Sequence, residues 1–136
     1  MIKTNELMTG DWVYMEANRG YEAQYIQVET IPDASAEDHY GHIGAFPVGG
    51  DNDFRDIEDK HLFPIPLTPE ILEKNGWDWN GEIWINTDIL FAIENGYDRE
   101  IRYWWHMFNS PIVRINYVHE LQHALRLCEI KKEIKL

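Results

Sequence analysis

A two-turn helix with both ends encoded in the sequence sets the framework for this chain of 136 residues. Thr68 carries a hydroxyl that can accept a hydrogen bond from the free amides of a first helical turn. Pro69 suits the first helical position, where its missing N–H has no partner to lose, and Glu70 follows at the positive end of the helix dipole. Asn75 and Gly76 then provide a left-handed stop. We therefore predict a helix from Pro69 to Asn75 that is capped by Thr68.

Strands are expected on both sides of this helix. Short runs of alternating apolar residues, separated by turn sequences such as Asn80-Gly81 and Asn95-Gly96, are typical of antiparallel strands. A change of phase between Tyr25 and Ile26 predicts a bulge or a sharp bend in the strand over residues 21–30. The predicted strands are residues 12–15, 21–30, 39–46, 82–86, 89–94, 100–108 and 111–115.

A second helix is expected near the end of the chain, from about Tyr117 to Cys128, with Asn116 as its cap. The tail over residues 130–136 can form a short edge strand. No linker or repeat divides the chain, so we predict a single α+β domain over residues 1–136. Its parts are a curled antiparallel N-terminal sheet, for which an SH3-like fold is one form, the short helix, an antiparallel meander and the C-terminal helix.

Acidic residues dominate the charge of the chain. The 24 acids and 12 bases give a net charge of −12, and residues 1–66 hold 13 acids and 4 bases, a net charge of −9. A protein that binds the phosphate backbone needs clustered lysine and arginine, so we expect no binding to double-stranded nucleic acid. The simplest interpretation of the acidity is that it favours solubility. Two more specific interpretations are an acidic face that binds a basic partner and a mimic of DNA.

The remaining composition points to the cytoplasm. Cys128 is the one cysteine, which excludes an internal disulfide. No apolar run reaches the length of about 18 residues that a membrane helix needs. Residues 1–6 lack the apolar stretch of a secretory signal. We expect a cytoplasmic protein that does not bind a membrane.

Three strings at the start, middle and end of the chain carry a resemblance to a known family. They are NELMTGDWV at 5–13, PIPLTPEILEKNGW at 64–77 and YVHELQ at 117–122. In this order they resemble a large family of small uncharacterised proteins of Bacteroides-type gut bacteria and their phages and prophages. The resemblance implies a mobile-element setting and fits a cytoplasmic location. It implies no activity and no catalytic residue.

One motif is typical of catalysis, and it lies on the predicted C-terminal helix. His119, Glu120 and His123 form an H-E-x-x-H pattern, in which two histidines one turn apart bind zinc and the glutamate is the general base. A catalytic zinc also needs a third protein ligand. Glu129 follows at a suitable interval but is expected to stay on the helix away from the pair, and His106 of the meander is an alternative.

The helix geometry argues against a zinc site. At 100° per residue, Leu121 and Leu125 fall on an apolar stripe, while His119 and His123 fall opposite it beside Arg126. The two histidines are then either part of a solvated polar face or packing residues at the junction of helix and sheet. We predict no metal site, no catalytic residue and no cofactor.

Three further groups of residues carry side chains that can bind metals or react. The acidic segment 51–59 lacks the ligand spacing of an EF-hand and is expected to be a solvated loop. His39, His42 and His61 lie near it, but strand geometry places residues three apart on opposite faces, so we predict no shared metal. Cys128 lies on the apolar stripe and is expected to be a buried structural residue.

The chain is rich in tryptophan, and two roles are open for these residues. Most large aromatic side chains in a domain of this size belong to the core. The alternative is an exposed platform for a sugar or a peptide. The candidates for either role are Trp77, Trp79, Trp84, Trp104 and Trp105.

The function expected from these observations is a non-catalytic accessory protein of a mobile element that acts as a protein-binding module. Two alternatives remain open. One is a small zinc peptidase built on His119, Glu120 and His123, and the other is an acidic DNA mimic.

Overall fold

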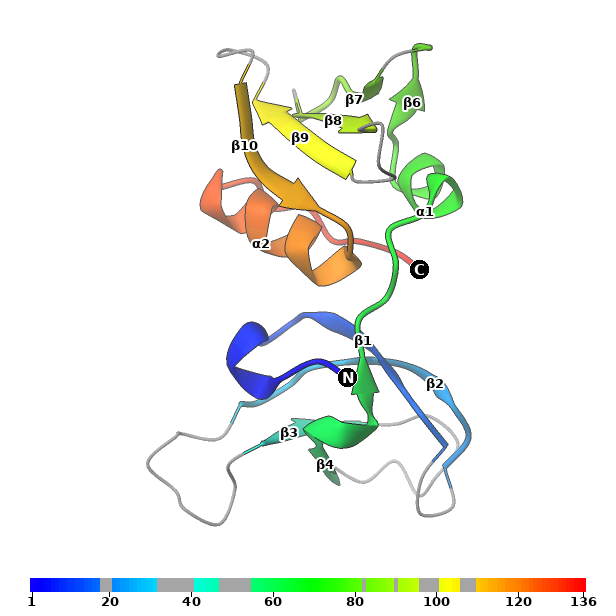
Figure 1. Ribbon diagram of the computed structural model, residues 1–136, viewed down its shortest axis with the longest axis vertical. Coiled ribbons are helices and arrows are strands. Elements are labelled where there is room, and N and C mark those ends of the chain that lie inside the picture. The colour runs from blue at the N-terminus through cyan, green and yellow to red at the C-terminus, as the bar shows by residue number, and fades with distance from the viewer. Residues whose placement is uncertain are drawn as a thin grey trace. The chain divides into compact units, whose positions relative to one another are not determined.

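The computed structural model describes residues 1–17, 21–31, 41–46, 55–81, 83–89, 91–95, 101–105 and 110–136. It has antiparallel sheets, one short helix and a C-terminal helix, so the predicted α+β class is confirmed (Figure 1). The chain divides into two compact units, the N-terminal unit Met1–Ile65 and the C-terminal unit Pro66–Leu136. The prediction of one domain concerns how these units associate, and it stays a prediction.

The N-terminal unit is built from short antiparallel strands. The strand order β2-β1-β5 forms a three-stranded sheet, and β3 pairs with β4. An isolated bridge between Thr30 and Gly44 joins the segment after β2 to β3. The elements are η1 (Thr4–Glu6), β1 (Trp12–Met15), β2 (Gln24–Gln27), β3 (His42–Ala45), β4 (Arg55–Glu58), η2 (Asp59–His61) and β5 (Leu62–Phe63).

Alternation along the strands places one face of this sheet in a core. In β1 the side chains of Val13 and Met15 are buried, and in β2 Ile26 is buried, whereas their neighbours are more exposed. The predicted strands at residues 12–15, 21–30 and 39–46 correspond to β1, β2 and β3, and β1 has the predicted bounds. The core residues are Ile2, Leu7, Val13, Met15, Ile26, Val28, Ile43, Ala45, Ile57 and Leu62.

Three details of the N-terminal unit differ from prediction. The β1–β2 register runs without a break from Trp12↔Gln27 to Met15↔Gln24, so the bulge predicted at Tyr25 and Ile26 is wrong. The acidic segment is not all loop, because β4 pairs residue by residue with β3 and η2 follows it. Ile57 explains the strand, since its buried side chain lies opposite Ile43.

The described strands of the N-terminal unit form an open sheet. They do not close into an SH3-like barrel.

The C-terminal unit is a five-stranded meander with two helices. Its strand order is β10-β9-β8-β7-β6, so each strand pairs with its neighbour in sequence. The antiparallel meander was predicted, but its first strand, β6, was not. The helix α2 lies along β10 (Figure 1). The elements are α1 (Pro69–Lys74), β6 (Asp78–Trp79), β7 (Ile83–Asn86), β8 (Phe91–Asn95), β9 (Ile101–Trp105), β10 (Ser110–Ile115) and α2 (Val118–Leu127).

The predicted cap of α1 is confirmed. The Oγ1 atom of Thr68 accepts a hydrogen bond from the Ile71 amide at 3.4 Å, and Pro69 opens the helix. Asn75 ends the helix, and Gly76 follows with φ +84°, a backbone conformation that glycine adopts more readily than other residues.

Asn75 also holds the tail of the chain, for which an edge strand was expected. Its Nδ2 donates to the Lys135 carbonyl at 2.7 Å, and the Lys135 amide donates to its Oδ1 at 2.8 Å. The same Nδ2 donates to the Ile71 carbonyl at 2.8 Å. Residues 130–136 form no strand. The buried Asn75 side chain makes the hydrogen bonds with the Lys135 backbone that a neighbouring strand would otherwise make.

Within the described ranges, no helix is long and apolar enough to cross a membrane.

Candidate functional site

The H-E-x-x-H motif begins one residue into α2, and its glutamate is engaged at the helix start. Glu120 Oε2 accepts hydrogen bonds from the backbone amides of Asn116 at 2.6 Å and Tyr117 at 3.1 Å. Tyr117 is the N-cap residue, in place of the predicted Asn116. A carboxylate in this position stabilises the free amides and the positive end of the helix dipole. Glu120 is therefore turned back toward the helix start.

The two histidines are not on a solvated face. His119 is only 5% exposed, and its ring stacks on Tyr117 with centroids 5.8 Å apart. His123 is half-buried, and its ring meets that of His119 edge to face at 5.7 Å. Gln122, which the helical pattern also places off the apolar stripe, is 8% exposed. Of the two expectations, a packing role describes His119, and a solvated polar face is wrong for it.

The described residues do not complete a three-ligand metal site. In the ranges that the structure describes, no three His, Cys, Asp or Glu side chains gather where they could hold one ion. His106, the alternative third ligand, lies outside those ranges. The predicted position of Glu129 on the helix is wrong, because α2 ends at Leu127 and Glu129 follows it.

Glu129 has the backbone conformation that usually belongs to glycine after a helix. Its φ is +58°, the single positive value at a non-glycine residue among those described. The Glu129 amide donates to the Arg126 carbonyl at 2.9 Å, and the Ile130 amide donates to the Leu125 carbonyl at 2.9 Å. These two bonds define a Schellman motif. The motif turns the chain out of α2 and into the tail.

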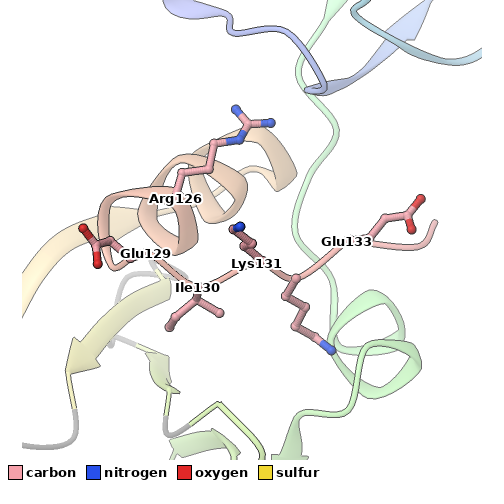
Figure 2. Close-up of a pocket in the computed structure, with 6 residues that line it drawn as sticks. Arg126, Glu129, Ile130, Lys131 and Glu133 are labelled. Carbon is pink, nitrogen blue, oxygen red and sulfur yellow. The ribbon is translucent and has the colours of Figure 1, made fainter.

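An open pocket of about 780 Å³ lies where α2 meets the tail (Figure 2). Figure 2 shows the charged ends of Arg126, Glu129 and Glu133 pointing in different directions. The lining carries three bases and two acids, and this mixture favours no single class of ligand. The lining residues are Arg126, Glu129, Ile130, Lys131, Lys132 and Glu133.

The other candidate metal and thiol residues form no group of three metal ligands in the part of the chain that the structure describes. His42 lies in β3, while His61 lies in η2 with its Nδ1 3.9 Å from Glu16 Oε2. His39 and residues 51–53 lie outside the described residues. Cys128 is half-buried, and burial raises the pKa of its thiol, which lowers the fraction of reactive thiolate.

The tryptophans divide between the core and the surface. Trp77 is fully buried and Trp84 is 5% exposed, so the core role is confirmed for both. Trp79, on the edge strand β6, is 45% exposed and lies 5.4 Å from the Trp84 ring. Trp104 and Trp105 belong to β9, but their side chains lie outside the description. These residues do not form one described platform.

A different aromatic surface lies on the N-terminal sheet. The register places Tyr25 of β2 opposite Tyr14 of β1, and Phe63 of β5 opposite Tyr14 on the other side. The Tyr14 and Tyr25 rings meet edge to face, with centroids 5.9 Å apart. Trp12 is two residues before Tyr14, so it points to the same side of the strand. We call Trp12, Tyr14, Tyr25 and Phe63 the aromatic face.

This face points away from the core. The alternate residues Val13, Met15, Ile26 and Leu62 are buried, so their neighbours on the same strands point to the opposite side of the sheet. Tyr25 is 53% exposed, and the other three members are half-buried. Exposed aromatic patches on a soluble domain are typical of interaction sites. In the sequence, the alternation in residues 12–15 indicates only that Trp12 and Tyr14 share one side of β1.

Polar residues continue the same side of the sheet. Glu16 lies one residue past the end of β1 and two residues after Tyr14, and its backbone amide donates to the His61 carbonyl at 3.0 Å. Gln27 lies opposite Trp12 and donates through Nε2 to the Gly10 carbonyl at 3.0 Å. The aromatic face therefore has a polar border that includes one carboxylate.

Comparisons of the chain with models of protein families, with curated proteins and with solved structures found no match to any of them.

Proposed function

We propose that this chain is a cytoplasmic, non-catalytic protein-binding module, and that the aromatic face is its binding surface. The observation that carries this proposal is the row of Tyr25, Tyr14 and Phe63 across three strands, on the side of the sheet opposite the core. Tyrosine, tryptophan and phenylalanine are enriched at protein interfaces, where they supply large contact areas at a low cost in conformational entropy.

The state of the H-E-x-x-H motif supports a non-catalytic role. In a zinc peptidase the glutamate activates the metal-bound water, yet Glu120 accepts two backbone hydrogen bonds at the start of α2. His119 packs against Tyr117 in a buried position. Both residues thus have a role in the structure of the helix. The resemblance in sequence supports an accessory role in a bacterial mobile element.

Affinity capture tests the binding function. The purified protein is immobilised and exposed to an extract of a Bacteroides-type bacterium, beside a Leu62→Asp bait in which the core of the N-terminal unit is disrupted. We expect at least one protein to be retained in near-equal amount by the folded bait alone, and to re-form the complex when purified separately. If no such protein is retained from extracts with and without resident prophages, the proposal is wrong.

Metal analysis tests the peptidase alternative. Protein prepared without a histidine tag should hold no stoichiometric zinc and should not cleave casein. About one zinc per chain, lost in both His119→Ala and His123→Ala, would establish the metal site instead.

Competition tests the alternative of a DNA mimic. If the captured partner binds DNA, and DNA displaces this chain from it, the acidic surface acts as a mimic. Retention of the partner in the presence of excess DNA supports the module proposed here.

A further inference from the structure

We infer that the aromatic face binds a basic segment of the partner protein, with lysine and arginine side chains lying over its rings. This inference rests on the proposed function, because it specifies the chemistry of the partner at the same surface.

The charge of the N-terminal unit favours a cationic partner. Residues 1–65 hold 13 acids and 4 bases, a net charge of −9, while the remaining residues hold 11 acids and 8 bases, a net charge of −3. An excess of one sign raises the local concentration of partners of the opposite sign and accelerates their association. The aromatic face thus lies on the unit that attracts a basic segment more strongly.

A carboxylate borders the rings themselves. Glu16 has a side chain that is 52% exposed, and it lies directly after β1, two residues beyond Tyr14. Its Oε2 lies 3.9 Å from His61 Nδ1, a distance that leaves the carboxylate available to a stronger cation. A lysine or arginine over Tyr14 would then have an acidic group within reach.

The rings of the aromatic face offer a second attraction for lysine and arginine side chains. The face of an aromatic ring carries negative charge density, so ammonium and guanidinium groups bind over it within about 6 Å of the centroid. The same protein contains such a contact, because Lys132 Nζ lies 5.6 Å from the Trp77 ring centroid. The edge-to-face arrangement of Tyr14 and Tyr25, with 66° between the ring planes, presents two differently oriented rings to a ligand.

Single-stranded nucleic acid also stacks on aromatic residues of sheets, but it needs a basic groove for its phosphates. The N-terminal unit carries a net negative charge, which repels phosphates. A second copy of this chain carries the same acidic charge and would be repelled. A basic polypeptide is the occupant that satisfies both the charge and the rings.

Nuclear magnetic resonance titration tests the inference on the whole chain. The probe is a short peptide of alternating lysine and glycine, and the control peptide has glutamate in place of lysine. We expect saturable shifts of the Trp12 indole signal and of the amides of Tyr14, Tyr25 and Phe63 with the lysine peptide. These shifts should weaken as salt is added, and the glutamate peptide should cause none.

Two variants locate the contact. Tyr25→Ala should weaken binding about fivefold, the equivalent of one cation–π contact, while Glu16→Gln should reduce the salt dependence. Phe46→Ala is the matched control, because Phe46 is 54% exposed in the same unit but is not a member of the face. Glu16→Gln retains the size of the side chain and keeps the test valid if Tyr25→Ala does not fold.

The outcomes separate the two proposals. Equal shifts with both peptides, shifts confined to other surfaces, or none at all would overturn the basic-segment inference. In that case the binding module still stands if capture retains a partner. Self-association that Tyr25→Ala abolishes would assign the face to a second copy, and would also overturn the inference. Peptide binding without any captured partner would contradict the proposed function alone.

Discussion

Glu129 adopts a left-handed backbone conformation that costs an L-amino acid about 1 kcal/mol or more. Its carboxylate also lies at the negative end of the α2 dipole. Glu129→Gly should therefore raise the free energy of unfolding by about 1 kcal/mol, measured by urea denaturation. Glu133→Gly, in the same tail but without a positive φ, is the control and should not stabilise the protein.

Glu120 has a structural role that a substitution can expose. Glu120→Gln keeps one acceptor oxygen but removes the charge that strengthens two backbone hydrogen bonds. We expect the free energy of unfolding to fall by about 1 kcal/mol. Glu73→Gln, at an exposed position of α1, should change it little. Unchanged stability combined with a lost peptidase activity would contradict the structural role.

At the scale of residues, the sequence located the motif but not its surroundings. The helical pattern placed His119 opposite the apolar stripe, and it did not decide between a solvated polar face and a packing role at the junction of helix and sheet. The imidazole ring of His119 stacks on Tyr117 at the first turn, where a flat ring can be buried by its neighbours. The left-handed residue that ends α2, Glu129, was also not predicted, because this position after a helix is usually occupied by glycine or asparagine.

At the scale of elements, α1 tests the capping argument. Thr68→Ala removes the oxygen that accepts from the Ile71 amide, so the free energy of unfolding should fall by about 1 kcal/mol. Thr87→Ala, at an exposed turn position, is the matched control. If the two substitutions lower the free energy of unfolding equally in thermal denaturation, the Thr68 cap does not stabilise α1.

The tail depends on one side chain of another element. Asn75→Ala deletes the three part-buried hydrogen bonds that its side-chain amide makes with the backbone of Ile71 and Lys135. We expect stability to fall by about 2 kcal/mol and the Lys135 amide to exchange hydrogen faster. The exposed Asn5→Ala should alter neither measurement. Persistent protection of the Lys135 amide would show that the tail is held by other contacts.

Most elements could be predicted because local rules agree with tertiary packing. Alternation marked β1 and most of the meander, and capping residues marked α1. β4 was missed because its four residues contain one apolar side chain, Ile57, among three charged ones. The aromatic face was missed for a related reason, since it exists only when the register brings three strands together. Pairing across strands is set by contacts between residues far apart in sequence.

At the scale of the whole molecule, charge predicts behaviour toward nucleic acid. The net charge of −12 repels phosphates at every salt concentration and most strongly at low salt. A gel-shift assay with double-stranded DNA at low salt should show no complex at micromolar protein. A lysine-rich protein provides the positive control. A complex that dissociates as salt is added would contradict this expectation.

The two units also differ in when they can close during synthesis. The Ile2 amide donates to the Leu62 carbonyl, so the backbone pairing of the N-terminal unit is complete once residues up to 65 have left the ribosome. The C-terminal unit pairs Asn75 with Lys135, so the contact between its first helix and the tail forms only after residue 135 has been added. Chains fold largely from the N-terminus as they are made. We therefore expect the aromatic face to assemble during translation before the C-terminal unit closes.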